Sequence, residues 1–142
     1  MLKIGIHYTD PNMPKIEQPT GGKNWIDLYT IEDCAFKAGD TIKISLGVVV
    51  KVPPMHEALM APRSSTFVRY GVIQGNSIGV IDETYCGKDD VWHWVGYATR
   101  DGFIPKYTRI CQFRIQPRMM AFNLEDYDPS SESRGGFGST GF

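Results

Sequence analysis

The 142-residue sequence is poor in the residues that build metal clusters and disulfide frameworks. It contains only three cysteines and three histidines, and the cysteines Cys34, Cys86 and Cys111 show no C-x-x-C spacing. Structural zinc sites and disulfide-stapled secreted folds need closely spaced pairs of such residues, so we expect neither here. An odd number of unpaired cysteines favours free, reduced thiols.

The sequence also lacks a charge imbalance and long apolar runs. Its formal net charge is -1, so composition provides no bulk attraction to nucleic acid or to an anionic membrane. No apolar run approaches the roughly 18 residues that a membrane span requires, and the N-terminus has no basic-then-apolar signal pattern. We therefore expect a soluble, cytoplasmic protein that does not bind nucleic acid directly, and any site for a polyanion has to gather its positive charge locally.

A helical hydrophobic period is missing as well, and residues 54–60 have room for one helical turn at most. Short alternating or β-branched segments instead recur between turn signals such as Gly75-Asn76 and Asp101-Gly102. Many short strands in a chain of this length predict an all-β fold, a sandwich or a jelly-roll-like β-barrel. The predicted strands are Leu2–Ile6, Thr41–Lys51, Thr66–Ile73, Ile78–Ile81, Val91–Ala98 and Arg109–Ile115.

The composition changes near the C-terminus. Residues 123–134 are rich in Asp, Glu and Ser, and residues 134–142 are mostly Gly, Ser and Thr. Such a segment has too little apolar surface to offset the entropy of ordering it. We predict a β-barrel domain over residues 1–122 and a mobile C-terminal arm over residues 123–142. A dispensable disordered terminus is the alternative interpretation of this arm.

The arm carries a glycine-rich segment that begins at Arg134. Glycines let backbone N–H groups converge on phosphate oxygens, and Arg134 adds a planar guanidinium fork. Ser139 and Thr140 add hydroxyl donors, while Phe137 is a lone aromatic residue that could close over a ring. No G-K-[ST] sequence is present, so this is not a Walker A loop.

Two further segments combine residue types that suit a nucleotide. In Ala61–Thr66 an arginine stands beside hydroxyls that could hold phosphates, although a solvated turn with a surface arginine is the alternative. In Gly75–Gly87 we expect a hairpin in which Asn76 and the backbone read a planar base. Asp82 ends an apolar run, where a carboxylate can be partly desolvated and act as a base. Tyr85 could pack flat on a sugar; the alternative is a turn acid followed by a half-buried tyrosine.

Taken in order, these segments resemble the five motifs of the trimeric dUTPases, and especially the subgroup of Gram-positive bacteria and their phages. The resemblance implies hydrolysis of dUTP to dUMP and pyrophosphate with Mg²⁺, which supplies dUMP for dTMP synthesis and keeps uracil out of DNA. It also implies a homotrimer with shared active sites, in which the arm closes as a lid. The matching segments are Trp25–Leu28, Ala61–Thr66, Gly75–Gly87, Arg109–Phe113 and Gly135–Gly141.

The resemblance assigns a role to individual residues around the sugar and base. Asp82 matches the carboxylate that orients or deprotonates the water attacking the α-phosphorus. Tyr85 matches the ring under the deoxyribose, and Asn76 with the backbone around Gly79 matches the reader of uracil. Trp92, His93 or Trp94 could instead supply the aromatic cover of the base.

The resemblance also implies contacts along the triphosphate. Arg63, Ser64 and Gln112 match phosphate ligands, and Ser65 is a weaker candidate. Asp27 matches an acid that lies near either Mg²⁺-bound water or the arginine of the second motif. The arm residues implied to clamp the γ-phosphate and cover the uracil are Arg134, Gly136, Phe137, Gly138, Ser139 and Thr140.

The sequence departs from the family pattern at two points. Glu132 stands where the fifth motif usually has its arginine, and Arg134 directly precedes Gly135 instead. Tyr107-Thr108 replace the usual Gly-Asp before Arg109. Two other functions stay open on sequence grounds: a dCTP deaminase-type enzyme of the same fold, and a phage dUTPase that acts mainly as a regulator by binding a host repressor protein.

Overall fold

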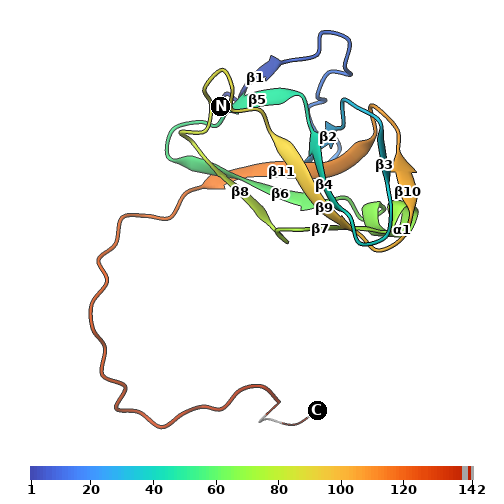
Figure 1. Cartoon of the computed structure of the whole chain (residues 1–142). Helices are drawn as coiled ribbons and strands as arrows, with labels where there is room; N and C mark the ends of the chain where they lie inside the picture. Colours follow the sequence, from blue (N-terminus) through green and yellow to red (C-terminus); the bar gives the residue numbers. More distant parts are fainter. Residues whose placement is uncertain (139–140, 142) are drawn as a thin grey trace.

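The computed structural model describes residues 1–138 and 141, and its regular secondary structure consists almost entirely of short antiparallel strands (Figure 1). The all-β prediction is confirmed, but the strands form four separate hydrogen-bonded sheets, without a closed ladder in the described part of the chain. The elements are β1 (Gly5–Tyr8), β2 (Ile26–Tyr29), β3 (Cys34–Phe36), β4 (Thr41–Ser45), β5 (Val48–Lys51), β6 (His56–Pro62), α1 (Thr66–Tyr70), β7 (Val72–Gln74), β8 (Gly79–Asp82), β9 (His93–Ala98), β10 (Gly102–Ile104) and β11 (Arg109–Pro117).

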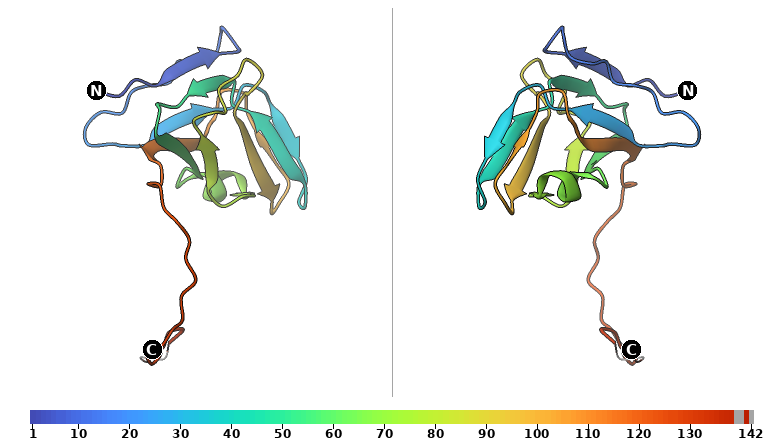
Figure 2. Two further views of the ribbon diagram at one scale, coloured as in Figure 1. Left: turned by 90° about the vertical axis from the view of Figure 1, so that its left-hand side faces the viewer. Right: turned by 90° about the vertical axis from the view of Figure 1, so that its right-hand side faces the viewer.

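Two larger sheets form the body. One has the order β2-β11-β6-β8, and the other has the order β4-β9-β7. The pairs β1-β5 and β3-β10 complete the fold. Figure 2 shows that the sheets surround a common interior. Strands that follow one another in the sequence often belong to different sheets.

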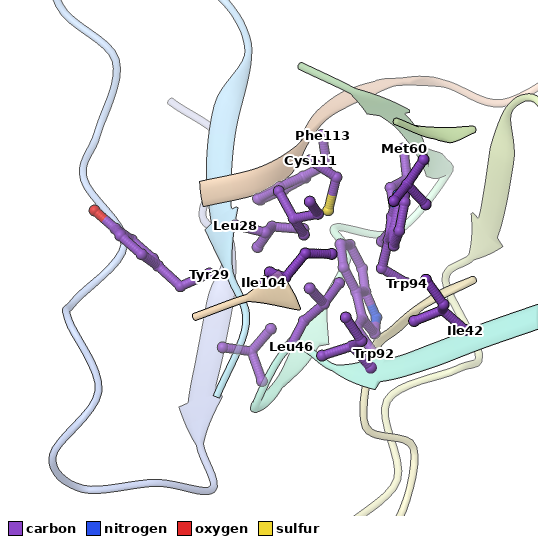
Figure 3. Packing of buried hydrophobic residues seen from close by; sticks show 14 of the residues in the cluster. Leu28, Tyr29, Ile42, Leu46, Met60, Trp92, Trp94, Ile104, Cys111 and Phe113 are labelled. Atoms are coloured by element: carbon purple, nitrogen blue, oxygen red, sulfur yellow. The ribbon is translucent and has the colours of Figure 1, made fainter. Parts of the chain in front are cut away.

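The interior is filled by large apolar side chains from both of these sheets (Figure 3). Trp92 packs edge to face on Phe113, with ring centroids 5.2 Å apart and an interplanar angle of 84°. Trp94 is fully buried, and its indole N–H donates to Oε1 of Gln74 at 2.8 Å. Trp92 and Trp94 are both buried in the core, whereas His93 between them is exposed, as expected for the alternation of a strand.

The four-stranded sheet alternates between an apolar inner face and a polar outer face. Cys111 and Phe113 are buried in the core, whereas Gln112 between them is only half-buried. On the outer face Gln112 is paired in register with Asp27 of β2 on one side and with Ala61 of β6 on the other. The polar candidate residues therefore lie on the outer face of this sheet, which faces away from the core.

The segment Thr66–Ile73 was expected to be a strand, and for most of its length this is wrong. Residues 66–70 form helix α1, and only Val72–Gln74 continue as a strand. The Thr66 hydroxyl accepts the N–H of Arg63 at 3.1 Å and donates to the carbonyl of Ile110 at 2.7 Å, which holds the first turn against β11. Gly71, with φ 66°, ends the helix in the left-handed conformation that glycine adopts without strain.

One other local expectation is also wrong. The segment Gly75–Gly87 is not a hairpin, since β7 pairs with β9 while β8 pairs with β6. Local alternation cannot say which partner strand completes a ladder. Within residues 54–60, which had room for one helical turn at most, residues 54–55 form a turn and β6 begins at His56.

The C-terminal arm leaves the body at the end of β11 and extends away from it (Figures 1 and 2). Residues 117–137 are exposed, and in the described part of the arm no hydrogen bond to the body follows that of Arg118. The division at residue 122 stays a prediction. No helix in the described part of the chain is long and apolar enough to cross a membrane.

Replacing Thr66 with valine should lower the free energy of unfolding by about 1–3 kcal/mol. The near-isosteric change removes one hydroxyl that serves two hydrogen bonds and leaves the buried carbonyl of Ile110 without this donor. Urea denaturation measures the difference, and Thr66→Ser, which keeps the hydroxyl, is the control. A valine variant as stable as the original would contradict this account of α1.

Candidate active site

A pocket of about 340 Å³ lies against strand β8 and the turn that precedes it. Asn76, Gly79, Asp82 and Tyr85 all line it, so the four residues singled out in Gly75–Gly87 converge on one cavity. Gly79 is buried, and an added Cβ would stand 3.1 Å from Cβ of Met60, so the wall at this position leaves little room for a side chain. The remaining lining residues are Lys43, Met60, Val80, Ile81, Val91, Trp92 and His93.

The turn that carries Asn76 is held by the buried side chain of Gln74. Its amide nitrogen donates to the carbonyls of Met60 at 3.0 Å and Ser77 at 2.9 Å, and its oxygen accepts the indole N–H of Trp94. One amide thus ties the turn to β6 and to the core. The backbone beside Asn76 is therefore preorganised before any ligand arrives.

Asp82 ends β8, and its carboxylate is shaped by a local turn. Oδ1 accepts both the hydroxyl and the backbone N–H of Thr84, the latter at 2.8 Å. These bonds, from the hydroxyl first and the backbone second, lower the pKa of Asp82 below its ordinary value. The expectation of a partly desolvated carboxylate is wrong for the single chain, because Asp82 is exposed. It is ionised and fixed in direction, as a proton acceptor needs to be.

The aromatic candidates near the pocket separate into two groups. Tyr85 is 43% exposed beside Asp82, so its ring is available to a ligand. His93 is also exposed and lines the pocket, with Nδ1 2.8 Å from the carbonyl of Val91. Trp92 and Trp94 are buried core residues, and of these two only Trp92 reaches the pocket wall.

A second cluster gathers arginines around Asp27. Nε of Arg63 lies 3.2 Å from one carboxylate oxygen of Asp27, and Nη1 of Arg109 lies 3.8 Å from the other. The Arg109 guanidinium also donates to the hydroxyl of Tyr29 at 3.1 Å. Of the two roles open to Asp27, the structure places it against the second-motif arginine; a contact through water to a metal stays a prediction.

The other phosphate candidates lie next to this cluster. Gln112 donates to the carbonyl of Pro62 at 3.1 Å, which links β11 to the end of β6. Ser64 is exposed and Ser65 half-buried in the turn between β6 and α1. Residues from the first, second and fourth motifs therefore meet within one chain, around a locally positive centre.

The pocket and the arginine cluster are nevertheless separate. Asp82 is in register with Glu57 of β6, whereas the cluster is in register with Ala61, about 13 Å further along that strand. Asp27 and Asp82 also lie on opposite edge strands of the sheet, and three strand spacings add an offset of about 14 Å across the sheet to the offset along the strands. A single chain does not bring Asp82 and Arg63 to the same phosphate.

The arm residues are not brought to either place by their own chain. Arg134, Gly136 and Phe137 are exposed, and Gly138 is half-buried, without a described hydrogen bond to the body. Ser139 and Thr140 lie outside the described residues. No group of three His, Cys, Asp or Glu side chains that could hold a metal ion occurs within residues 1–138 and 141.

Sequence reasoning missed several residues that build the site. Gln74 and Thr84 hold the turn and the carboxylate, and Lys43 of β4 reaches the pocket from another sheet. A lone amide inside an apolar run, and a threonine two residues after an aspartate, are local signals that could have identified the first two. No local signal identifies Lys43, because only tertiary folding brings it there.

Comparison with known proteins identifies a family and relatives of the chain. A family profile described as dUTPase matches residues 13–141. The SPbeta prophage-derived deoxyuridine 5'-triphosphate nucleotidohydrolase YosS of Bacillus subtilis (strain 168) is 45% identical over 141 residues, which cover 99% of each chain.

Solved structures show the same fold at lower identity. The dUTPase of Staphylococcus bacteriophage 80alpha, solved with dUpNHpp, has a TM-score of 0.81 at 18% identity. The match covers 100% of both chains. A mutant dUTPase from phage phi11 of S. aureus, whose structure concerns a structural Mg(II) ion, has a TM-score of 0.76 at 13% identity, over 91% of this chain and 99% of that one.

Fold and site together define an all-β protein with a pocket beside an oriented carboxylate and a separate arginine cluster. With the profile match and the prophage relative, the assignment is direct: the chain belongs to the dUTPase family.

Removing the hydroxyl of Thr84 should raise the pKa of Asp82 toward that of an ordinary aspartate. The side-chain bond is the largest cause of the lowered pKa, and its loss leaves only the backbone donors. Asp82 in Thr84→Ala would then take up its proton at a higher pH than in the original protein. Carboxyl ¹³C NMR titration measures this, with Thr84→Ser as the control that keeps the hydroxyl; identical midpoints in all three proteins would exclude this cause.

Proposed function

We propose that the protein hydrolyses dUTP to dUMP and pyrophosphate, with Asp82 as the base. The observation that carries this assignment is the convergence of Asn76, Gly79, Asp82 and Tyr85 on one pocket in a chain of the dUTPase family. The named relatives are deoxyuridine triphosphate nucleotidohydrolases, and one structural neighbour is solved with dUpNHpp.

The pocket suits a pyrimidine deoxynucleoside. Asn76 and the backbone between β7 and β8 offer fixed donors and acceptors to the edge of uracil, and the bonds of Gln74 keep them in place. A cytosine amino group would leave part of that edge without partners, which is costly in a closed site. The ring of Tyr85 would lie under the deoxyribose and leave no room for a 2′-hydroxyl.

The reaction needs a water molecule to attack the α-phosphorus. Asp82 would take one proton from this water as its oxygen bonds to phosphorus, and the bond from phosphorus to the bridging oxygen would break to release pyrophosphate. A lowered pKa keeps the carboxylate ionised and able to accept that proton. Thr84 would hold the acceptor oxygen in line during the step.

The phosphate ligands would come from a neighbouring subunit of a homotrimer. Arg63, Ser64 and Gln112 lie too far from Asp82 to meet it around one triphosphate within a chain. On the outer face Asp27, Arg63 and Gln112 are only half-buried in the single chain. They are therefore accessible to a neighbouring subunit.

The arm would complete the site from another subunit. It leaves the body without folding back, so Arg134 and Phe137 are available to a neighbouring chain (Figure 2). The glycine-rich segment 135–141 would then close over the triphosphate, with Phe137, or His93 of the pocket wall, against the uracil. Closure would exclude water other than the reacting molecule.

Magnesium would be bound mainly by the triphosphate. The described residues offer no complete cage, and both oxygens of Asp27 face arginines, so the protein side chains fit an indirect role only. When bound, Mg²⁺ would neutralise part of the phosphate charge. The two other functions open on sequence grounds, deamination of dCTP and a mainly regulatory role, are not favoured by the family match.

The purified protein should release pyrophosphate from dUTP far faster than from dTTP, dCTP or UTP at fixed Mg²⁺. Asp82→Asn should keep its affinity for dUpNHpp and lose about 100-fold or more in kcat, because the proton acceptor is gone. Ammonia released from dCTP would point to the deaminase, and near-normal kcat in Asp82→Asn would remove Asp82 as the base.

Mixing two inactive variants should restore activity if sites are shared between subunits. Arg63→Gln and Asp82→Asn, unfolded together in equal amounts and refolded, should reach about a quarter of the original activity, since random assembly leaves both intact groups at one site in four. Each variant refolded alone is the control. If the mixture stays as inactive as its components, Arg63 and Asp82 serve the same site from the same chain.

A further inference from the structure

The root of the C-terminal arm is fastened to the residue that follows Asp82. Nη1 of Arg118, one residue past β11, lies 3.0 Å from Oε1 of Glu83. The other oxygen of Glu83 accepts the backbone N–H of Met55 at 3.0 Å. The backbone N–H of Arg118 in turn donates to the carbonyl of Met55 at 3.0 Å. Three segments far apart in the sequence thus close one ring of hydrogen bonds, which we call the arm clamp.

The arm clamp is poorly suited to stabilising the fold. The side chains of Arg118 and Glu83 are 49% and 25% exposed, and ion pairs with this degree of solvent access contribute little to stability. Met55 has φ 66°, a left-handed conformation that is unfavourable for a side-chain-bearing residue. The clamp therefore holds a strained turn in place with bonds that are weak individually, which is more typical of positioning than of packing.

The position of the clamp connects it to the carboxylate on one side. Thr84 orients Asp82 from two residues downstream, and Glu83 is the residue between them. The backbone of residues 82–84 is therefore fixed both by the turn at Thr84 and by the clamp at Glu83. Glu57 lies opposite Asp82 in the ladder. Glu57, Asp82 and Glu83 line one apolar groove, and Arg118 brings a cation to these three acids.

On the other side the clamp sets where the arm begins. Arg118 is the last described residue of the arm that is hydrogen-bonded to the body, so its placement fixes the origin and the initial direction of everything that follows (Figure 1). A change at this point therefore alters where the arm begins, and with it the region that the glycine-rich segment can reach.

We propose that Glu83 and Arg118 are a pair of positioning residues that couple the exit of the arm to the orientation of Asp82. This inference rests on the proposed function of Asp82. Neither residue touches the substrate: Glu83 acts through the backbone of Asp82 and Thr84, and Arg118 acts through the arm. The pair serves the chemical step. If Asp82 is misaligned, the reaction slows while the pocket still binds the uracil and the sugar.

The experiment compares Glu83→Gln, Arg118→Gln and the double variant in the full-length protein. Each single change should lower kcat for dUTP about tenfold with KM within about twofold, and the double variant should be no worse than either single one, because the two residues act as one unit. Lys51→Gln, which removes a cation from the exposed side of β5, is the matched control and should keep the original kcat. Arg118→Lys keeps the charge without the fork and should recover part of the loss.

Hydrogen exchange supplies a readout that does not depend on turnover. The amides of Thr84 and Arg118 should exchange faster in both single variants, while amides of the core strand β9 should be unchanged. Additive losses of kcat, or unchanged exchange at Thr84 in Arg118→Gln, would overturn the coupling. If the unmodified protein hydrolyses dUTP and Asp82→Asn does not, but the clamp variants keep full kcat, the clamp inference falls and the proposed function stands. Absence of dUTP hydrolysis in the unmodified protein would overturn both.

Discussion

The function of this protein depends on the spacing that one four-stranded sheet imposes on its polar residues. Asp82 stands on one edge strand and Asp27 on the other, with the arginine cluster near the far end of β6. Hydrogen-bonded strands do not slide past one another without losing their ladder, so these distances are fixed by the fold. Under the proposed function, a triphosphate site that uses both Asp82 and Arg63 would need more than one copy of the chain. The accessible outer face of the sheet and the extended arm are compatible with such an assembly.

The candidate base owes its properties to local hydrogen bonds and not to burial. Two donors of Thr84 hold one oxygen of Asp82 and lower its pKa, while the carboxylate stays exposed in the single chain. Desolvation would come later, when nucleotide and arm close over it and strengthen each electrostatic contact inside. This order of events would separate the charge state of Asp82, which the chain fixes alone, from its reactivity, which assembly and ligand would provide.

The support of the pocket is also divided between rigid and adjustable parts. Gln74 and Trp94 join the base-reading turn to the centre of the core, where close packing allows little movement. The arm clamp on Glu83 and Arg118 lies instead at a solvent-exposed end of the four-stranded sheet, where weaker bonds permit adjustment. Under the proposed function, the rigid part would serve recognition of a planar base, and the adjustable part would serve an arm that opens and closes.

The sequence by itself determined the all-β class and singled out Asn76, Asp82 and Tyr85, which the structure brings to one pocket, because alternation, turn residues and ordered motifs are local properties. The role of the arm stays a prediction. It did not determine that residues 66–70 are helical, since the decisive bond runs from Thr66 to a carbonyl 44 residues away. Nor did it determine which strands pair, because any alternating segment fits several partners. Tertiary structure alone decided that Gln74 braces the pocket, that Asp27 faces Arg63, and that Arg118 meets Glu83, since each of these contacts joins segments that chain folding brings together.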